Sequence, residues 1–142
     1  MENGKEIVLK YEAEYEISKH DEDSGFDVRC TDKFSLMPGD FKTISLGIKL
    51  EIPKGYEVQL RPRSGLNAKG ILLQLGTIDE GYRGILKAVM INLSTEKISF
   101  NRLDRVGQIV VSKLPSVKAV KVDKVKEDTK RASNGFGSTG IK

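Results

Sequence analysis

An alternation of apolar and polar side chains between residues 41 and 52 constrains the fold more than any other feature of this chain. Apolar residues occupy every second position, at Ile44, Leu46, Ile48, Leu50 and Ile52. A period of two places all of them on one face of a β-strand, whereas a helix would scatter them around its axis. We therefore expect one strand across residues 41–52, with one face in a core.

Further short strands are predicted because turn residues separate the other apolar runs. The turn signals lie at residues 37–40, 53–55, 79–81 and 101–104. The strand candidates are residues 7–9, 26–28, 56–60, 85–93, 98–100, 106–111 and 117–122. No window of 11 or more residues keeps a helical period, although residues 63–70 can hold a short helical turn. Many short strands at this spacing predict an all-β sandwich, jelly roll or barrel.

The chain contains one cysteine, Cys30, and one histidine, His20. These counts exclude a disulfide within the chain and a zinc site built from cysteine and histidine. A Ser-His-Asp triad would depend on His20, and no G-x-S-x-G sequence accompanies it. Any catalysis must therefore use carboxylates, hydroxyls, Arg, Lys, Gln, backbone groups or a metal held by oxygen ligands.

The net charge of +4 is concentrated near the C-terminus. Residues 117–142 hold seven basic and three acidic side chains, which leaves residues 1–116 neutral. A neutral body does not suit a long phosphate backbone, so we expect no nucleic-acid partner. The basic segment suits a small, local anion instead.

Neither a membrane span nor a targeting segment is predicted. No apolar run approaches the roughly 18 residues of a membrane-spanning helix. Residues 1–10 lack the apolar stretch of a signal peptide. We therefore expect a soluble, cytoplasmic protein with no membrane partner.

The composition changes from Glu127 onward, where small, polar and glycine residues replace the apolar ones. We expect one β domain over residues 1–126 and a flexible glycine-rich tail over residues 127–142. Residues 135–140 match G-x-G-x-x-G, but no βαβ unit surrounds them, so a dinucleotide fingerprint is excluded. The glycines can still direct N–H groups at an anion, and Phe136 can cap a flat ligand. The alternative is a frayed terminus.

Three internal stretches carry groups suited to phosphate chemistry. Residues 61–66 combine two arginines with a serine and a glycine, residues 76–84 place Asp79 and Tyr82 in a glycine-rich hairpin, and residues 104–110 set Gln108 within an apolar run. Arginine, hydroxyl and backbone N–H groups are common phosphate ligands. Each stretch also has a structural alternative: an exposed arginine pair, a tight turn and a buried amide that satisfies backbone groups.

Together and in order, these stretches resemble the five motifs of the homotrimeric dUTPase family. The matching segments are Ser24–Val28, Pro62–Leu66, Gly76–Gly84, Asp104–Gln108 and Arg131–Gly140. The resemblance implies a jelly-roll-like β-barrel or sandwich subunit and a homotrimer with active sites shared between subunits. It also implies hydrolysis of dUTP to dUMP and pyrophosphate with Mg²⁺, by a catalytic domain over residues 1–126 and a tail that closes over an active site.

The resemblance further implies a role for each matching residue. Asp79 would orient and deprotonate the water that attacks the α-phosphorus. Tyr82 would pack on the deoxyribose and leave no room for a 2′-hydroxyl. Asp27 would position the waters of Mg²⁺ or neighbouring site residues.

The remaining substrate contacts fall into three implied groups. The backbone near Gly76, Thr77, Ile78 and Lys87 would read uracil. Phosphate oxygens would be held by Arg63, Ser64, Gly65 and Gln108. The tail residues that would close over the ligand are Arg131, Phe136, Gly137, Ser138 and Thr139.

Three body residues depart from the family pattern. Leu73 stands where many members have Asn, Gly81 replaces a common acidic residue, and Gly107 stands where Ala is usual. Two alternative functions are a dCTP deaminase of the same fold and a non-catalytic nucleotide-binding or regulatory jelly roll. The hairpin around Asp79 and the phenylalanine-glycine tail favour dUTP hydrolysis.

Overall fold

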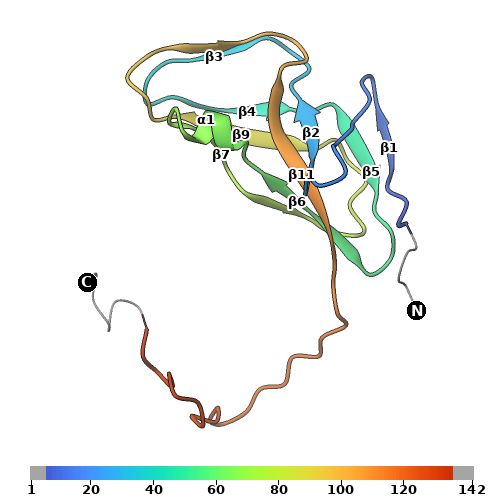
Figure 1. Ribbon diagram of the computed structural model, residues 1–142, viewed down its shortest axis with the longest axis vertical. Coiled ribbons are helices and arrows are strands. Elements are labelled where there is room, and N and C mark those ends of the chain that lie inside the picture. The colour runs from blue at the N-terminus through green and yellow to red at the C-terminus, as the bar shows by residue number, and fades with distance from the viewer. Residues whose placement is uncertain (1–5, 136–142) are drawn as a thin grey trace.

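The computed structural model describes residues 6–135, which form eleven short β-strands and one helix of a single turn (Figure 1). All seven strand pairings are antiparallel. The predicted all-β class is therefore confirmed. The elements are β1 (Lys10–Ala13), β2 (Phe26–Arg29), β3 (Phe34–Leu36), β4 (Phe41–Ser45), β5 (Ile48–Glu51), β6 (Tyr56–Arg61), α1 (Ser64–Asn67), β7 (Ile71–Leu73), β8 (Gly76–Ile78), β9 (Lys87–Asn92), β10 (Ile98–Phe100) and β11 (Arg105–Lys113).

Two larger sheets organise the molecule. One has the strand order β2-β11-β6-β8 and the other has the order β4-β9-β7. Two further strand pairs, β1-β5 and β3-β10, extend this framework. The described part of the chain has no helix of the length and apolar character needed to cross a bilayer.

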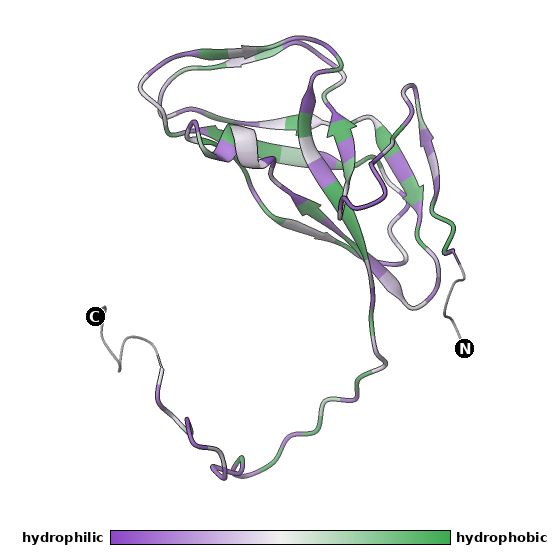
Figure 2. Ribbon diagram, in the orientation of Figure 1, coloured by the Kyte–Doolittle hydropathy of each residue, from purple (hydrophilic) through white to green (hydrophobic). Residues whose placement is uncertain are grey.

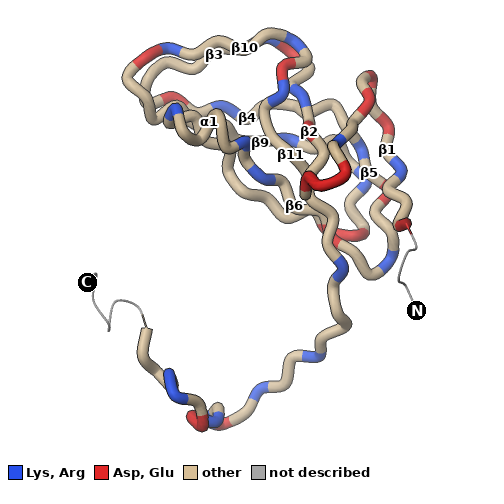
Figure 3. The backbone as a smooth tube through the Cα atoms, in the orientation of Figure 1, with Lys and Arg blue, Asp and Glu red and all other residues tan. Residues whose placement is uncertain are grey.

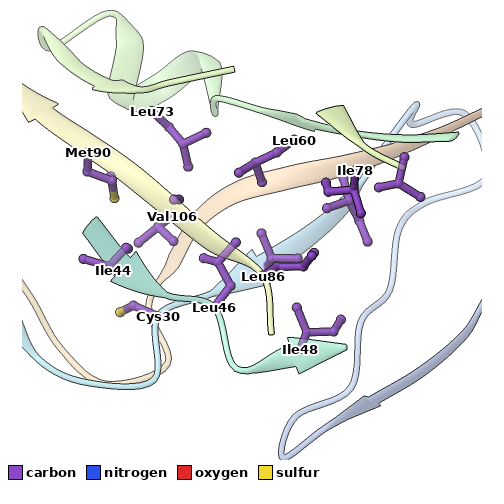
Figure 4. Close-up of a cluster of buried hydrophobic side chains, with 14 of the residues drawn as sticks. Cys30, Ile44, Leu46, Ile48, Leu60, Leu73, Ile78, Leu86, Met90 and Val106 are labelled. Carbon is purple, nitrogen blue, oxygen red and sulfur yellow. The ribbon is translucent and has the colours of Figure 1, made fainter. Parts of the chain in front are cut away.

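A single apolar core joins the two larger sheets (Figure 4). Val58 and Leu60 from β6 enter it from one sheet, and Ile44 and Met90 from β4 and β9 enter it from the other. The alternation that the sequence predicts places these side chains inward because successive residues of a strand face opposite sides. The core is thus built from the alternate residues of each strand whose side chains point inward.

Buried polar groups attach the segments on both sides of β2 to this core. The hydroxyl of Tyr15 donates to the carbonyl of Leu46 at 2.6 Å and accepts from the backbone N–H of Arg29 at 3.1 Å. Cys30 is 1 % exposed, and its Sγ lies 3.1 Å from the carbonyl oxygen of Asn101. Burial raises the pKa of both the Tyr15 hydroxyl and the Cys30 thiol, because it disfavours their charged forms.

The prediction of one continuous strand over residues 41–52 is wrong, because Gly47 divides it into β4 and β5. Gly47 has φ of 59°, a left-handed conformation that other residues adopt at a cost. A Cβ at this position would also overlap Cγ2 of Thr31. The backbone can therefore turn here from one sheet to the next while the apolar alternation continues unbroken.

Several other boundaries differ from the expectations. The first strand lies at Lys10–Ala13 instead of residues 7–9, because its pairing with β5 begins at Lys10. Strands β3, β7 and β8 have three residues each and were not predicted, since so short a run carries little periodicity. The expected helical turn within residues 63–70 is confirmed as α1.

The strand predicted at residues 117–122 is absent. Strand β11 ends at Lys113, and residues 114–134 are exposed and run away from the sheets in Figure 1. Val117, Val120, Val122 and Val125 are 79 %, 68 %, 55 % and 72 % exposed, and hydrophobic positions recur along this segment in Figure 2. A strand is stabilised by pairing with a neighbour, and within residues 6–135 no strand pairing includes residues 117–122.

Replacing Gly47 tests the turn between β4 and β5. We expect Gly47→Ala to lower the free energy of unfolding by about 2–4 kcal/mol, because left-handed strain adds to a clash with Thr31. Urea denaturation measures the change. The matched control is Gly39→Ala, whose φ of 85° is also positive but whose added Cβ meets nothing within 4 Å.

The clash can be separated from the backbone strain by a double variant. In a Thr31→Ser background, which removes Cγ2, Gly47→Ala should cost about as much as Gly39→Ala. An equal cost in both backgrounds would show that Thr31 does not set the conformation of this turn.

Candidate active site

A cavity of about 370 Å³ lies beside the segment that runs from β8 to β9. This volume is within the range of small-ligand sites in proteins and can accommodate a nucleoside. The predicted residues Gly76, Thr77, Ile78, Asp79, Tyr82 and Lys87 all line it. Leu60, Ile85 and Leu86 complete the wall, and no sequence motif points to these three apolar residues.

The connection from β8 to β9, two strands that belong to different sheets, places Asp79 and Tyr82 by simple strand geometry. Ile78 is the last residue of β8 and is buried, so the chain leaves the sheet at Asp79, whose side chain is exposed. The N–H of Tyr82 donates to the Asp79 carbonyl at 3.0 Å, which closes a tight turn. Asp79 and Tyr82 therefore stand together at one cavity.

Gly84 determines how the Tyr82 ring lies. The Tyr82 hydroxyl donates to the carbonyl of Ile85 at 3.0 Å, so the ring folds back along the connection between β8 and β9. A Cβ on Gly84 would overlap this ring and its hydroxyl. A glycine at position 84 is therefore a requirement of the observed ring position.

A second, more polar cavity of about 680 Å³ is lined by residues of the first and fourth motifs. Asp27 on β2 is the direct strand partner of Gln108 on β11, and both line this cavity with Arg105. Nη1 of Arg105 lies 3.3 Å from Oδ2 of Asp27. Both side chains are partly exposed, so this pair orients its members more than it stabilises the fold.

Two hydrogen bonds attach the segment before α1 to the same cluster. Nε2 of Gln108 donates to the carbonyl of Pro62 at 3.1 Å, and Nη1 of Arg63 donates to the carbonyl of Arg105 at 3.1 Å. Ser64 and Gly65 follow at the start of α1, and both are exposed. The structure thus brings Asp27, Gln108 and the Arg63 segment together.

Gly25 is a site residue whose role the sequence alone does not reveal. It is buried, and an added Cβ would lie 2.5 Å from Oε1 of Gln108 and 3.0 Å from the carbonyl oxygen of Ile109. The absence of a side chain at position 25 is what leaves room for the amide of Gln108. Its location directly before β2 was visible in the sequence, but its contact across to β11 was not.

The departures at Leu73 and Gly107 compensate for each other. Leu73 is 4 % exposed and belongs to the core, so it does not offer a side chain to a ligand. A Cβ at position 107 would lie 2.7 Å from Cδ1 of Leu73. The larger side chain at one position therefore fits with the smaller residue at the other.

The two cavities are separate within one chain. Asp79 follows Ile78, which pairs with Val58, whereas Gln108 pairs with Arg61 near the opposite end of β6. With a rise of about 3.3 Å per residue and about 4.8 Å between strands, the backbones at Asp79 and Gln108 lie roughly 16 Å apart. The described residues that line one cavity do not line the other.

The tail residues stand apart from both cavities. Arg131 is exposed, and its Nε donates to the carbonyl of Asn134 at 2.6 Å. Lys and Arg residues recur along the segment that leads to it from β11 (Figure 3). The predicted contacts from Phe136, Gly137, Ser138 and Thr139 lie outside the described residues.

The described residues fit a metal that is held mainly by its substrate. Within residues 6–135, no group of three or more His, Cys, Asp or Glu side chains is placed to hold a metal ion. Asp27 contributes one carboxylate, 37 % exposed, to the polar cavity. Mg²⁺ commonly keeps several waters and takes one or two carboxylates together with substrate phosphates, so this single carboxylate suits it.

A cavity of nucleoside size and a separate polar cavity on an all-β scaffold suit a nucleotide-binding class of protein. A sequence model of the dUTPase family matches residues 12–140 of this chain. The chain belongs to the dUTPase family, so the resemblance drawn from the five motifs is confirmed.

Named relatives agree with this assignment. The deoxyuridine 5'-triphosphate nucleotidohydrolase of Neorickettsia sennetsu is 39 % identical and covers 98 % of this chain and 97 % of its own length. The enzyme of the same name from Alkaliphilus metalliredigens is 42 % identical over 87 % of each chain. The dUTPase of Staphylococcus bacteriophage 80alpha, solved with dUPNHPP, has a TM-score of 0.86 at 21 % identity and covers 94 % of this chain and 99 % of its own, which supports the jelly-roll-like fold.

Replacing Gly25 tests whether it leaves room for Gln108. We expect Gly25→Ala to lower the free energy of unfolding by about 1–3 kcal/mol through overpacking, as measured by urea denaturation. In a Gln108→Ala background the cost should fall by at least half, because only the contact with the Ile109 carbonyl remains. An equal loss of unfolding free energy in the two backgrounds would show that Gly25 does not leave room for Gln108.

Proposed function

We propose that this chain is a dUTP diphosphatase, which hydrolyses dUTP to dUMP and pyrophosphate. The observation that carries the proposal is the cavity of about 370 Å³, which is lined by Gly76, Thr77, Ile78, Asp79 and Tyr82 of the third motif. Asp79 and Tyr82 line this cavity together with the strand β8 backbone and Lys87. The family assignment and the named relatives support the same activity.

The cavity suits a deoxynucleoside whose base is read by backbone groups. The amide and carbonyl groups around Gly76, Thr77 and Ile78, with those near Lys87, would match the donors and acceptors on the edge of uracil. Tyr82 would pack on the sugar where a ribonucleotide carries its 2′-hydroxyl. Leu60 and Leu86 make the floor apolar, which strengthens each polar contact by excluding water.

Asp79 would act as the general base. Its carboxylate would orient a water and take its proton while the water oxygen bonds to the α-phosphorus. The bond from this phosphorus to the oxygen that bridges to the β-phosphate would break, and that oxygen would leave with pyrophosphate. An aligned water and a base are the main protein contributions to such a transfer.

The polar cluster would bind the triphosphate. Arg63, Ser64, Gly65 and Gln108 would supply cationic, hydroxyl, N–H and amide donors to phosphate oxygens. When bound, Mg²⁺ would neutralise part of the triphosphate charge, and Asp27 would hold its waters. The tail residues Arg131, Phe136, Gly137, Ser138 and Thr139 would close over the ligand.

We further propose a homotrimer in which different subunits supply these groups to one site. A base and the atoms that it serves must lie within about 3 Å of each other. The separate cavities of Asp79 and Gln108 are consistent with a site assembled across subunits. The exposed valines at positions 117, 120, 122 and 125 give the C-terminal segment an apolar surface suited to another copy.

A substrate comparison tests the activity and its alternatives. The purified protein is incubated with Mg²⁺ and each of dUTP, dCTP, dTTP and UTP, while pyrophosphate and ammonia are measured. We expect pyrophosphate from dUTP well above that from the other three. Ammonia from dCTP would indicate the deaminase alternative, and the absence of any turnover would indicate a nucleotide-binding or regulatory jelly roll.

Asp79→Asn tests the role of the base. The amide keeps the size and polarity of the side chain but cannot take a proton. We expect a folded protein that binds dUTP and has a kcat at least ~100-fold lower than wild type. A variant that retained most of its turnover would exclude Asp79 as the base.

Mixing two inactive variants tests the shared site. Asp79→Asn chains and chains that lack residues 127–142 are unfolded together and refolded. Some sites in a mixed trimer would then receive Asp79 from one chain and the tail from another, so activity should return to a measurable fraction of wild type. Each variant refolded alone is the control, and verified mixed oligomers without recovered activity would contradict the shared site.

A further inference from the structure

Glu80 directly follows the proposed base, and none of the roles described so far uses its side chain. Its Oε1 accepts a hydrogen bond from the backbone N–H of Gly55 at 2.6 Å. The two residues are 25 positions apart, so this contact joins residues 79–85, called the Asp79 turn below, to the turn between β5 and β6. A hydrogen bond to a carboxylate is stronger than one between neutral groups.

The other hydrogen bonds of the Asp79 turn stay within it. The N–H of Tyr82 donates to the Asp79 carbonyl, and Nη1 of Arg83 donates to the carbonyls of Glu80 and Tyr82 at 2.6 Å and 3.2 Å. Gly81 contributes no side chain, and a Cβ there would meet nothing within 4 Å. Among the described residues, Glu80 therefore makes the side-chain hydrogen bond that ties this turn to another part of the chain.

Gly55 is a firm anchor for this contact. Its φ is 86°, and the turn around it is closed by the N–H of Tyr56, which donates to the carbonyl of Pro53 at 3.1 Å. The carbonyl of Gly55 accepts a further bond from the N–H of Leu114 at 2.8 Å. Gly55 thus joins the β5–β6 turn, the Asp79 turn and the point where the C-terminal segment leaves β11.

We propose that Glu80 is a positioning residue, whose carboxylate holds the Asp79 turn against Gly55 and so fixes the base at the rim of its cavity. The proposal rests on the proposed function, because the property that it explains is the placement of Asp79. A turn that contains Gly81 has extra conformational freedom, and a contact outside the turn restricts it. Small displacements of a catalytic group are costly, so the restriction bears directly on turnover.

Two variants separate the tether from the charge of Glu80. Glu80→Ala removes the acceptor, whereas Glu80→Gln keeps an acceptor oxygen in the same place. We expect Glu80→Ala to lower kcat for dUTP at least tenfold with KM changed less than threefold, and Glu80→Gln to retain kcat within about threefold of wild type. Glu96→Ala, an exposed glutamate on the connection between β9 and β10, is the matched control and should leave kcat unchanged.

Amide hydrogen exchange at Gly55, followed by NMR, tests the tether without any substrate. Exchange should be faster in Glu80→Ala than in wild type and close to wild type in Glu80→Gln, because protection follows the hydrogen bond. Unchanged exchange in Glu80→Ala, a wild-type kcat in that variant, or equal losses of kcat in both variants would each overturn the proposal. A wild-type chain without dUTP hydrolysis would overturn the proposed function, and the exchange data would still decide whether Glu80 holds the turn.

Discussion

Strand β6 pairs with β11 on one side and with β8 on the other, and this double pairing decides where the groups of the candidate site lie. The register with β11 places Gln108 beside Arg61, where β6 ends. The register with β8 places Ile78 beside Val58, so the chain departs toward Asp79 near the beginning of β6. Slipping either pairing by one residue would turn the inward side chains outward, so the core and the site are fixed by the same hydrogen bonds.

Two glycines shape this site, because the space that a side chain would fill at each is taken by a functional residue. Gly25 leaves the space that the Gln108 amide occupies, and Gly84 leaves the space that the Tyr82 ring occupies. Neither glycine has a left-handed backbone conformation. Glycine is therefore needed at these positions because another side chain packs closely against its Cα, and not because of its conformational freedom. The first and third motifs therefore share one feature: a glycine leaves the space that lets a larger functional side chain take its observed orientation.

The sequence was sufficient for the fold class and for most lining residues of the cavity beside the β8–β9 connection, because alternation and motif order are local properties. The break at Gly47 was not predictable, since a Thr31 contact and a positive φ appear only in the folded chain. The contact of Glu80 with Gly55 was equally hidden, because nothing local links residues 25 positions apart. The separation of Asp79 from Gln108 follows from the registers in which β6 pairs with β8 and with β11. Residue patterns within single strands do not determine these registers.

The burial of Cys30 has a practical consequence for studying the C-terminal segment. This cysteine is the only one in the chain, it is 1 % exposed, and burial raises its thiol pKa, so little reactive thiolate forms in the native state. A cysteine introduced at an exposed position such as Lys124 would therefore be the one site that a maleimide dye labels in the folded protein. Fluorescence from that dye can follow where the segment goes when nucleotide is added, without first removing a residue from the core.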